Sequence, residues 1–305
     1  MKLVLLGLPE VSYSWKNQIQ KDAMKHLGWE VVHLSPRKSS VSQIIANCKK
    51  ADLFIWAYTH GYEIGADVLR KVDNLCPTVS LHMDLYWGIP HRERLVGRHL
   101  LWKSDYVFTA DGGNQERFES RGVNHFWMSP GLSIDAIYVG KQMKNFFRHD
   151  IVFVGSCDPK IHKHRITMLE KIKNKYGSRF GWYTNVRGDQ LNNLFASAKL
   201  VLGDVATPKG KVFDKYWSDR LPITLGRGGI LVHPQIDGML EEGYSDGNNF
   251  IAFECGNFDQ LLEITDKAIA DASYRENMQR NAMNLIREKH TWVHKLEQVK
   301  RTVGL

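Results

Sequence analysis

The sequence predicts an α/β fold of two Rossmann-like domains. Short apolar runs of strand length alternate with amphipathic runs of helix length up to about residue 127, and a second series of the same kind starts at residue 151. Strands that alternate with helices indicate βαβ units and parallel sheets, which right-handed crossovers wind into doubly wound domains. Residues 128–150 break this rhythm with Pro130, Gly131 and a basic-aromatic run, so we interpret them as the interdomain connection.

Each expected strand is a short apolar run, and each expected helix has apolar residues at helical spacing. The strands are 2–6, 30–34, 53–57, 78–82, 106–109, 125–127, 151–154, 179–183, 200–203, 230–233 and 250–253. The helices are about 15–27, 41–50, 63–72, 114–121, 160–176, 189–197, one from Arg220 to the glycines, a short one near 238–242, then 258–271, 273–289 and 293–301. We expect domains at 1–145 and 146–290, with a closing helix in 291–305 that packs back on the first domain.

Composition narrows the class of protein. The chain has 305 residues, of which 43% are hydrophobic and 24% charged, which excludes a disordered protein. The net charge of +8 fits phosphate-bearing ligands or a polyanionic acceptor, although a solvated basic surface explains it equally well. The four cysteines form no CxxC pair, and the apolar N-terminus is too short for a signal peptide. With no apolar run near the length of a membrane span, we expect a cytoplasmic protein without a structural metal.

The segment 218–229 carries the clearest chemical signal. Ser218 and Asp219 are residue types that cap helices, and Arg220 follows them at the expected helix start. The N–H groups at a helix start bind phosphate, and a guanidinium beside them adds a bidentate clamp. The segment ends in Arg227-Gly228-Gly229 before a buried strand, so it predicts a phosphate site at the edge of a sheet.

Further motifs of the second half share this pattern. They are Gly155-Ser156 after the first strand, the stretch 246–251 that enters the last strand, and Arg287 with His290-Thr291-Trp292 near the closing helix. Together with 218–229 they resemble GT-B glycosyltransferases, most closely the spore-maturation-type branch of the family-1-like transferases. The first half resembles the family in architecture, and its segments 81–88 and 102–113 look like transferase-like proteins encoded by bacterial viruses.

The resemblance implies that the second domain binds a nucleotide-diphosphate sugar, with a UDP-hexose as the family habit, and that the first domain binds a hydroxyl acceptor. Arg220 and a helix N-terminus would neutralise the leaving diphosphate without an obligatory metal or other cofactor. Pro222 and Ile223 depart from the family, where a Glu at this place binds the ribose. Either Glu241 or Glu242 holds the ribose here, or the donor differs. The expected donor-binding residues are Gly155, Ser156, Arg165, Trp182, Tyr183, Trp217, Ser218, Arg220, Arg227, Gly228, Gly229 and Glu242.

Several of these residues also have purely structural explanations. Arg220 could pair with a neighbouring carboxylate, and Gly228-Gly229 could serve only as a helix end and tight turn. Arg165 could belong to a solvated basic face. Trp182 and Tyr183 could stack on the nucleobase or pack in the core.

An inverting reaction needs a base on the acceptor side, whereas a retaining one does not. Asp84, Asp111 and His60 each follow an expected strand, where active-site residues collect, so they are the catalytic candidates. Each could equally cap a helix, and His82 is better explained as a packed strand residue.

A basic run near two tryptophans suggests a second function. Arg92, Arg94, Arg98 and Lys103 form a basic run with Trp87 and Trp102 nearby, a mixture that suits a nucleic-acid backbone or a charged helix. It leaves open a DNA glycosyltransferase that acts on hydroxymethylated pyrimidines, which would have to flip the base out of the duplex. A non-catalytic nucleotide-sugar-binding module is a further alternative. A dinucleotide oxidoreductase is disfavoured, because the first strand is followed by Gly7-Leu8-Pro9-Glu10 and no G-x-G-x-x-G.

Overall fold

The computed structural model contains two α/β units and describes residues 1–60, 63–159, 162–205, 207 and 210–305. The first unit comprises Met1–Ser133 and Trp292–Leu305, and the second Ile134–Thr291. The first boundary therefore falls at residue 133, where the sequence suggested residue 145. Each unit has its own parallel sheet, in agreement with the predicted fold class.

The first unit is built on a six-stranded sheet in the order β2-β1-β3-β4-β5-β6, with every pair parallel. The strand order reverses between β1 and β3, which makes this position a topological switch point. Parallel sheets bind ligands there, at the carboxyl ends of the strands. The strands are β1 (Lys2–Leu6), β2 (Glu30–Leu34), β3 (Leu53–Ala57), β4 (Thr78–His82), β5 (Tyr106–Thr109) and β6 (His125–Trp127). The helices are α1 (Trp15–His26), α2 (Val41–Cys48), α3 (Ala66–Asp73), α4 (Pro90–Glu93), η1 (Leu100–Lys103), α5 (Gln115–Glu119) and α11 (Trp292–Val303).

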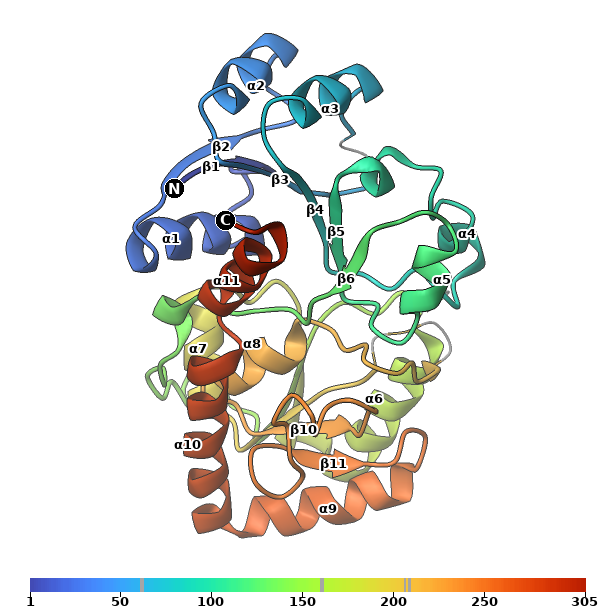
Figure 1. The fold of residues 1–305 in the computed structure, drawn as a ribbon. Coiled ribbons are helices and arrows are strands. Elements are labelled where there is room, and N and C mark those ends of the chain that lie inside the picture. The colour runs from blue at the N-terminus through green and yellow to red at the C-terminus, as the bar shows by residue number, and fades with distance from the viewer. Residues whose placement is uncertain (61–62, 160–161, 206, 208–209) are drawn as a thin grey trace. The chain divides into compact units, whose positions relative to one another are not determined.

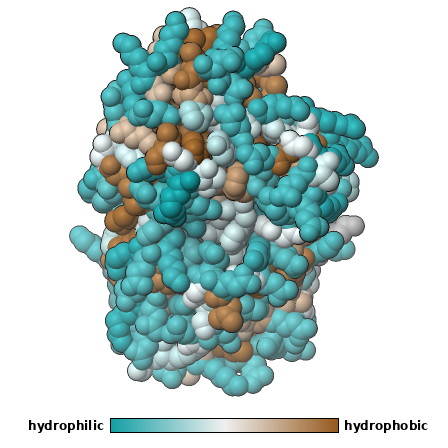
Figure 2. Space-filling view, in the orientation of Figure 1, coloured by the Kyte–Doolittle hydropathy of each residue, from teal (hydrophilic) through white to brown (hydrophobic). Residues whose placement is uncertain are grey.

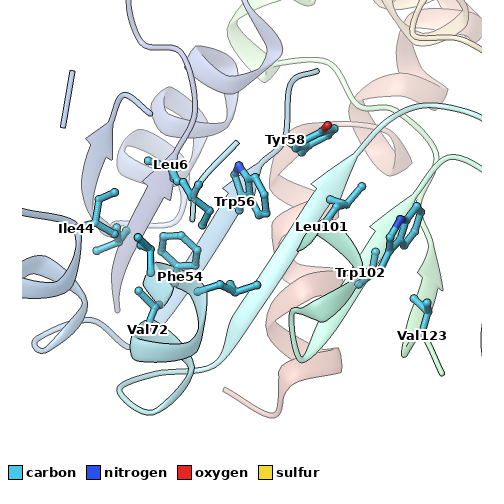
Figure 3. Close-up of a cluster of buried hydrophobic side chains, with 14 of the residues drawn as sticks. Leu6, Ile44, Phe54, Trp56, Tyr58, Val72, Leu101, Trp102 and Val123 are labelled. Atoms are coloured by element: carbon cyan, nitrogen blue, oxygen red, sulfur yellow. The ribbon is translucent and has the colours of Figure 1, made fainter. Parts of the chain in front are cut away.

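Alternating side chains give this sheet two apolar faces, since successive residues of a strand point to opposite sides. Leu6, Phe54 and Trp56 share one face with Ile44 of α2 and Val72 of α3, as Figure 3 shows. Such packing fixes the strands whose carboxyl ends carry the candidate residues.

The opposite face is covered by helices from the two ends of the chain. Leu3, Leu5 and Ile55 pack there with α1 and α11, which lie side by side in Figure 1. Trp15 of α1 stacks on Trp292 of α11 with ring centroids 5.4 Å apart. The C-terminal helix is thus part of the first unit.

The second unit has a five-stranded parallel sheet in the order β11-β10-β9-β7-β8. Its switch point lies between β7 and β9. The strands are β7 (Ile151–Val154), β8 (Phe180–Tyr183), β9 (Leu200–Leu202), β10 (Leu231–Pro234) and β11 (Ile251–Phe253). The helices are η2 (Ile134–Ala136), α6 (Lys163–Tyr176), η3 (Gly177–Arg179), α7 (Asp189–Ser197), α8 (Arg220–Gly226), α9 (Phe258–Ala270) and α10 (Ala272–Lys289). The short helix expected near 238–242 is wrong, because that segment forms turns.

Among the described residues, no helix is both long and apolar enough to cross a membrane. The face drawn in Figure 2 is covered mainly by hydrophilic residues, and its hydrophobic residues form small scattered groups.

Candidate functional site

A buried carboxylate holds two arginines together in the second unit. Asp204 follows β9, and its Oδ2 accepts a hydrogen bond from Arg165 Nε at 2.8 Å. Its Oδ1 accepts one from Nη1 of Arg220, the first residue of α8. The side chains of Arg165, Asp204 and Arg220 are only 5%, 6% and 15% exposed. This trio lies at the carboxyl end of the sheet, where β7 and β9 meet.

The charges of this trio do not cancel. Burial alone would raise the pKa of Asp204, but Arg220 and Arg165 outweigh burial and lower it to about 2 from the ordinary 3.8. Asp204 is therefore ionised at neutral pH. Within the described ranges, Asp204 is the carboxylate that pairs with either arginine. Two guanidiniums and one carboxylate leave one net positive charge, which suits an anionic ligand.

The loop after β7 packs directly on these arginines. Gly155 has a φ of 154°, and a Cβ there would lie 2.8 Å from Arg220 Nη2, so the position requires glycine. The carbonyl of Ser156 accepts a hydrogen bond from Arg165 Nη1 at 2.6 Å. Beneath them, the ring of Phe153 lies 4.7 Å from Arg220 Cζ. The predicted Gly-Ser loop and the predicted arginines therefore meet.

Two more predicted residues border this loop. Trp182 is the penultimate residue of β8, and its Nε1 donates a hydrogen bond to the Gly155 carbonyl at 2.8 Å. Because Trp182 is 46% exposed, its ring face is available for stacking. Ser218 Oγ is buried and has no hydrogen-bond partner among the described residues. Buried hydroxyls are normally satisfied, so an unpartnered one beside Arg220 points to a ligand. The expected helix cap is absent, since Asp219 holds the N-cap position without a capping hydrogen bond.

Other predicted donor residues have packing roles. Tyr183 is on the opposite face of β8 from Trp182 and packs edge-on to Phe147 at 5.7 Å. Trp217 is 1% exposed and packs edge-on to Tyr244 at 5.8 Å. The backbone carbonyl of Glu242 accepts a hydrogen bond from His290 Nε2 at 2.9 Å.

The end of α8 is tied to neighbouring helices. Arg227 donates to the Gly188 carbonyl at 3.1 Å and to the Asn192 side chain, and burial lowers its pKa. Gln279 of α10 donates to the carbonyl of Gly228 at 2.6 Å. A Cβ on Gly229 would lie 2.6 Å from Thr224 Cγ2. These residues precede β10, so they lie at the amino ends of the strands, opposite to the trio.

The first unit has a second polar cluster, at the carboxyl ends of β3 and β4. Asp84 Oδ2 lies 3.3 Å from His82 Nε2 and 3.9 Å from His60 Nε2. Arg92 Nη1 lies 3.4 Å from the other oxygen, Oδ1. Burial would raise the pKa of Asp84, but His82, Arg92 and His60 lower it to about 2. The structure thus brings together two of the three predicted catalytic candidates, and adds His82.

The third candidate is fully enclosed. Asp111 is 0% exposed, and its Oδ2 accepts hydrogen bonds from the backbone N–H groups of Tyr86 and Trp87 at 3.0 and 2.8 Å. Asn114 donates to its Oδ1 at 2.7 Å. These bonds give Asp111 a structural role, since it fixes the loop that carries Asp84.

The basic run is partly internal and partly exposed. Arg92 faces Asp84, and Trp102 is buried against Tyr86 with ring centroids 4.6 Å apart. Arg117 lies over the ring of Trp87, with Cζ 4.0 Å from the ring centroid. The exposed basic residues of this region are Arg94, Arg98, Lys103, Arg117 and Arg121.

The fold that positions these clusters is that of GT-B glycosyltransferases. Anabaena Alr3699/HepE, solved with UDP and glucose, is 13% identical, has a TM-score of 0.61 and matches 100% of this chain and 99% of its own. A glycosyltransferase from Rickettsia africae is 10% identical, with a TM-score of 0.65, over 99% of this chain and 97% of its own. An alpha-glucosyltransferase in complex with UDP and a 13-mer DNA that contains an HMU base is 9% identical, has a TM-score of 0.70 and matches 100% of both chains. At these identities the likeness establishes the fold.

The sequence itself identifies the activity class. Residues 163–301 match the family model described as glycosyl transferase-like. The match covers less than half of the chain, and together with the fold it confirms the predicted resemblance to GT-B glycosyltransferases. No curated protein sequence matches the chain.

Proposed function

We propose that the chain transfers a hexose from a UDP-hexose to a hydroxyl acceptor, and that the trio of Arg165, Asp204 and Arg220 holds the donor diphosphate. The observation that carries this proposal is the net positive charge that the trio keeps in a buried setting at the sheet's switch point. The UDP complexes of similar folds support the choice of nucleotide.

The two arginines have different tasks in this proposal. When the bond between the sugar and the diphosphate breaks, the leaving oxygen gains negative charge, which preorganised donors stabilise. Arg220 is the more exposed arginine, so it contacts the diphosphate. The hydroxyl of Ser218, which has no hydrogen-bond partner in the described part of the chain, adds a donor. Arg165 is a positioning residue, because it holds both Asp204 and the Ser156 carbonyl. The guanidinium charge makes a divalent cation unnecessary at the diphosphate.

The remaining groups complete the two substrate sites. Trp182 offers an exposed ring face beside the Gly155 loop for the nucleobase. On the acceptor side, the paired arrangement of His60 and Asp84 favours them over the enclosed Asp111 for activating the hydroxyl, as an inverting reaction requires.

A panel of nucleoside diphosphates and their hexoses tests the donor assignment by thermal shift. We expect selective stabilisation by UDP and UDP-hexose, since a ligand at 100 times its Kd stabilises the folded state by about 2.7 kcal/mol. The shift should persist in EDTA. If no nucleoside diphosphate raises the Tm, the proposal is wrong. Hydrolysis of UDP-hexose by the wild type, but not by a folded Arg220→Ala variant, would exclude a non-catalytic binding module.

A DNA acceptor is a second candidate function. The exposed basic residues between 94 and 121 favour it, as does the DNA complex of the similar alpha-glucosyltransferase. DNA binding should then weaken with salt, and Arg117→Ala/Arg121→Ala should reduce the log–log salt slope by about two. The control is Lys171→Ala/Lys173→Ala, two exposed lysines of the second unit. Absent or salt-insensitive DNA binding would exclude this acceptor.

A further inference from the structure

The cluster in the first unit has the donor set of a metal site. His60, His82 and Asp84 each offer one ligand atom, and these atoms all lie within 4.8 Å of one another. His82 and Asp84 are already close, with 3.3 Å between Nε2 and Oδ2. Ligands of one ion at about 2.1 Å lie nearer to each other than 4.8 Å. Coordination by all three residues would therefore require His60, whose side chain is 45% exposed, to move closer to the other two.

Both imidazoles are oriented from behind by a tyrosine. The Nε2 atoms point to the same carboxylate oxygen, whereas the Nδ1 atoms face hydroxyl groups: Tyr86 Oη for His82, and Tyr58 Oη at 3.4 Å for His60. Tyr58 donates its own proton to Glu63 Oε1 at 2.9 Å, so its oxygen can accept from His60 Nδ1. Metal-ligating histidines characteristically donate their second ring N–H to such an outer partner.

The two carboxylate oxygens of Asp84 also face different partners. Arg92 lies 3.4 Å from Oδ1 and also donates to the Leu85 carbonyl at 2.8 Å. Oδ2 is thereby directed to the two histidines. Two imidazole nitrogens and one carboxylate oxygen on one side of an ion suit divalent first-row transition metals and leave open positions for further ligands.

We propose that His60, His82 and Asp84 bind one divalent transition-metal ion. This departs from the expectation that the protein holds no metal. His82 ends β4, whereas His60 and Asp84 lie in the loops after β3 and β4, and only the fold brings the three together. An ion there would lower the pKa of a coordinated hydroxyl. That role rests on the proposed function, in which this unit binds the hydroxyl acceptor, whereas the binding itself does not.

Titration of the EDTA-stripped full chain with Zn²⁺ and Co²⁺ tests the site by calorimetry and by the Co²⁺ absorption spectrum. We expect one equivalent to bind, and His82→Ala and Asp84→Ala to abolish this step. Tyr86→Phe should weaken binding roughly ten- to hundredfold, as loss of an outer partner does. Arg92→Gln should strengthen it, because it removes a positive charge beside the ion.

The matched control is His91→Ala, an exposed histidine on α4. It should leave the affinity unchanged, and circular dichroism must show that every variant is folded. Absence of a stoichiometric site in the wild type, or an equal loss in His91→Ala, would overturn the proposal. Stabilisation by UDP is measured on the same samples. Its persistence without metal binding refutes the metal site alone, and its absence with metal binding intact refutes the proposed donor site alone.

Discussion

Asp84 and Asp204 each lie two residues after the end of a parallel strand, yet their surroundings differ. Each follows a buried parallel strand, and positive or protonatable neighbours lower the pKa of each to about 2. Asp204 is 6% exposed and has an arginine on each oxygen. The side chain of Asp84 is 36% exposed, with an arginine toward one oxygen and two histidines toward the other.

This difference indicates that Asp204 positions other residues, whereas Asp84 is placed to contact a ligand. The oxygens of Asp204 are both occupied by guanidiniums, so Asp204 positions the groups that meet the ligand. Asp84 is partly exposed, and one of its oxygens faces two imidazoles and no guanidinium, so it can itself meet a ligand. A similar pKa therefore does not imply a similar task, and exposure together with the identity of the neighbours decides between them.

The largest expected effect is on stability. Asp204→Ala should cost about 3–5 kcal/mol, because it leaves two buried guanidiniums without a counter-ion. Asp84→Ala should cost about 1 kcal/mol or less, as removal of an exposed ion pair does. Thermal unfolding midpoints in EDTA, followed by tryptophan fluorescence, measure both. Equal losses would contradict the proposed division.

Turnover should show the next largest effect. Arg220→Ala should lower turnover of UDP-hexose by about 10²–10³-fold, the typical loss of one preorganised donor. Arg220→Lys should recover only part, since an ammonium lacks the planar fork. Product release assays measure the rates, and Arg280→Ala provides an exposed arginine on α10 as control. Unchanged turnover in Arg220→Ala would show that the diphosphate binds elsewhere.

Acid should have a smaller, graded effect. The pKa of Asp204 is about 2 when folded and 3.8 ordinarily, so its stabilisation is complete above pH 4 and lost as the pH falls toward 2. The contribution is about 2 kcal/mol. The difference in unfolding midpoint between wild type and Asp204→Asn should therefore shrink between pH 4 and pH 2. A difference that stays constant over this range would contradict the lowered pKa.

Local pattern was sufficient to predict the strands and several residues of the cluster around Asp204, whose role in donor binding stays a prediction. Arg220 and Gly155 stand at a helix start and a strand end, and both positions can be read from apolar spacing. Asp204 was missed because its partners lie 39 and 16 residues away, and only the pairing of β7 with β9 brings them together. Its available signal was an acidic residue just after the buried run Leu200–Leu202.

Strand direction bears on the expectation that Gly228 and Gly229 bind the donor. Gly228 and Gly229 precede β10, so they belong to the amino end of the sheet, away from its ligand edge. His82 was interpreted as a packed strand residue, which its 6% exposure supports. Its role in a cluster depended on Asp84 and His60 from separate loops, and this tertiary arrangement is not visible in a single sequence.

The place of α11 also sets the order in which the molecule can be completed. The first unit needs Trp292–Leu305, which follow the whole of the second unit in the chain. During synthesis, residues 134–291 emerge before the face that carries Leu3 and Leu5 receives α11, the second of its two covering helices. Domains usually fold from the N-terminus onward as they are made. In this protein the first unit begins the chain but can complete its packing only after the second unit has been synthesised.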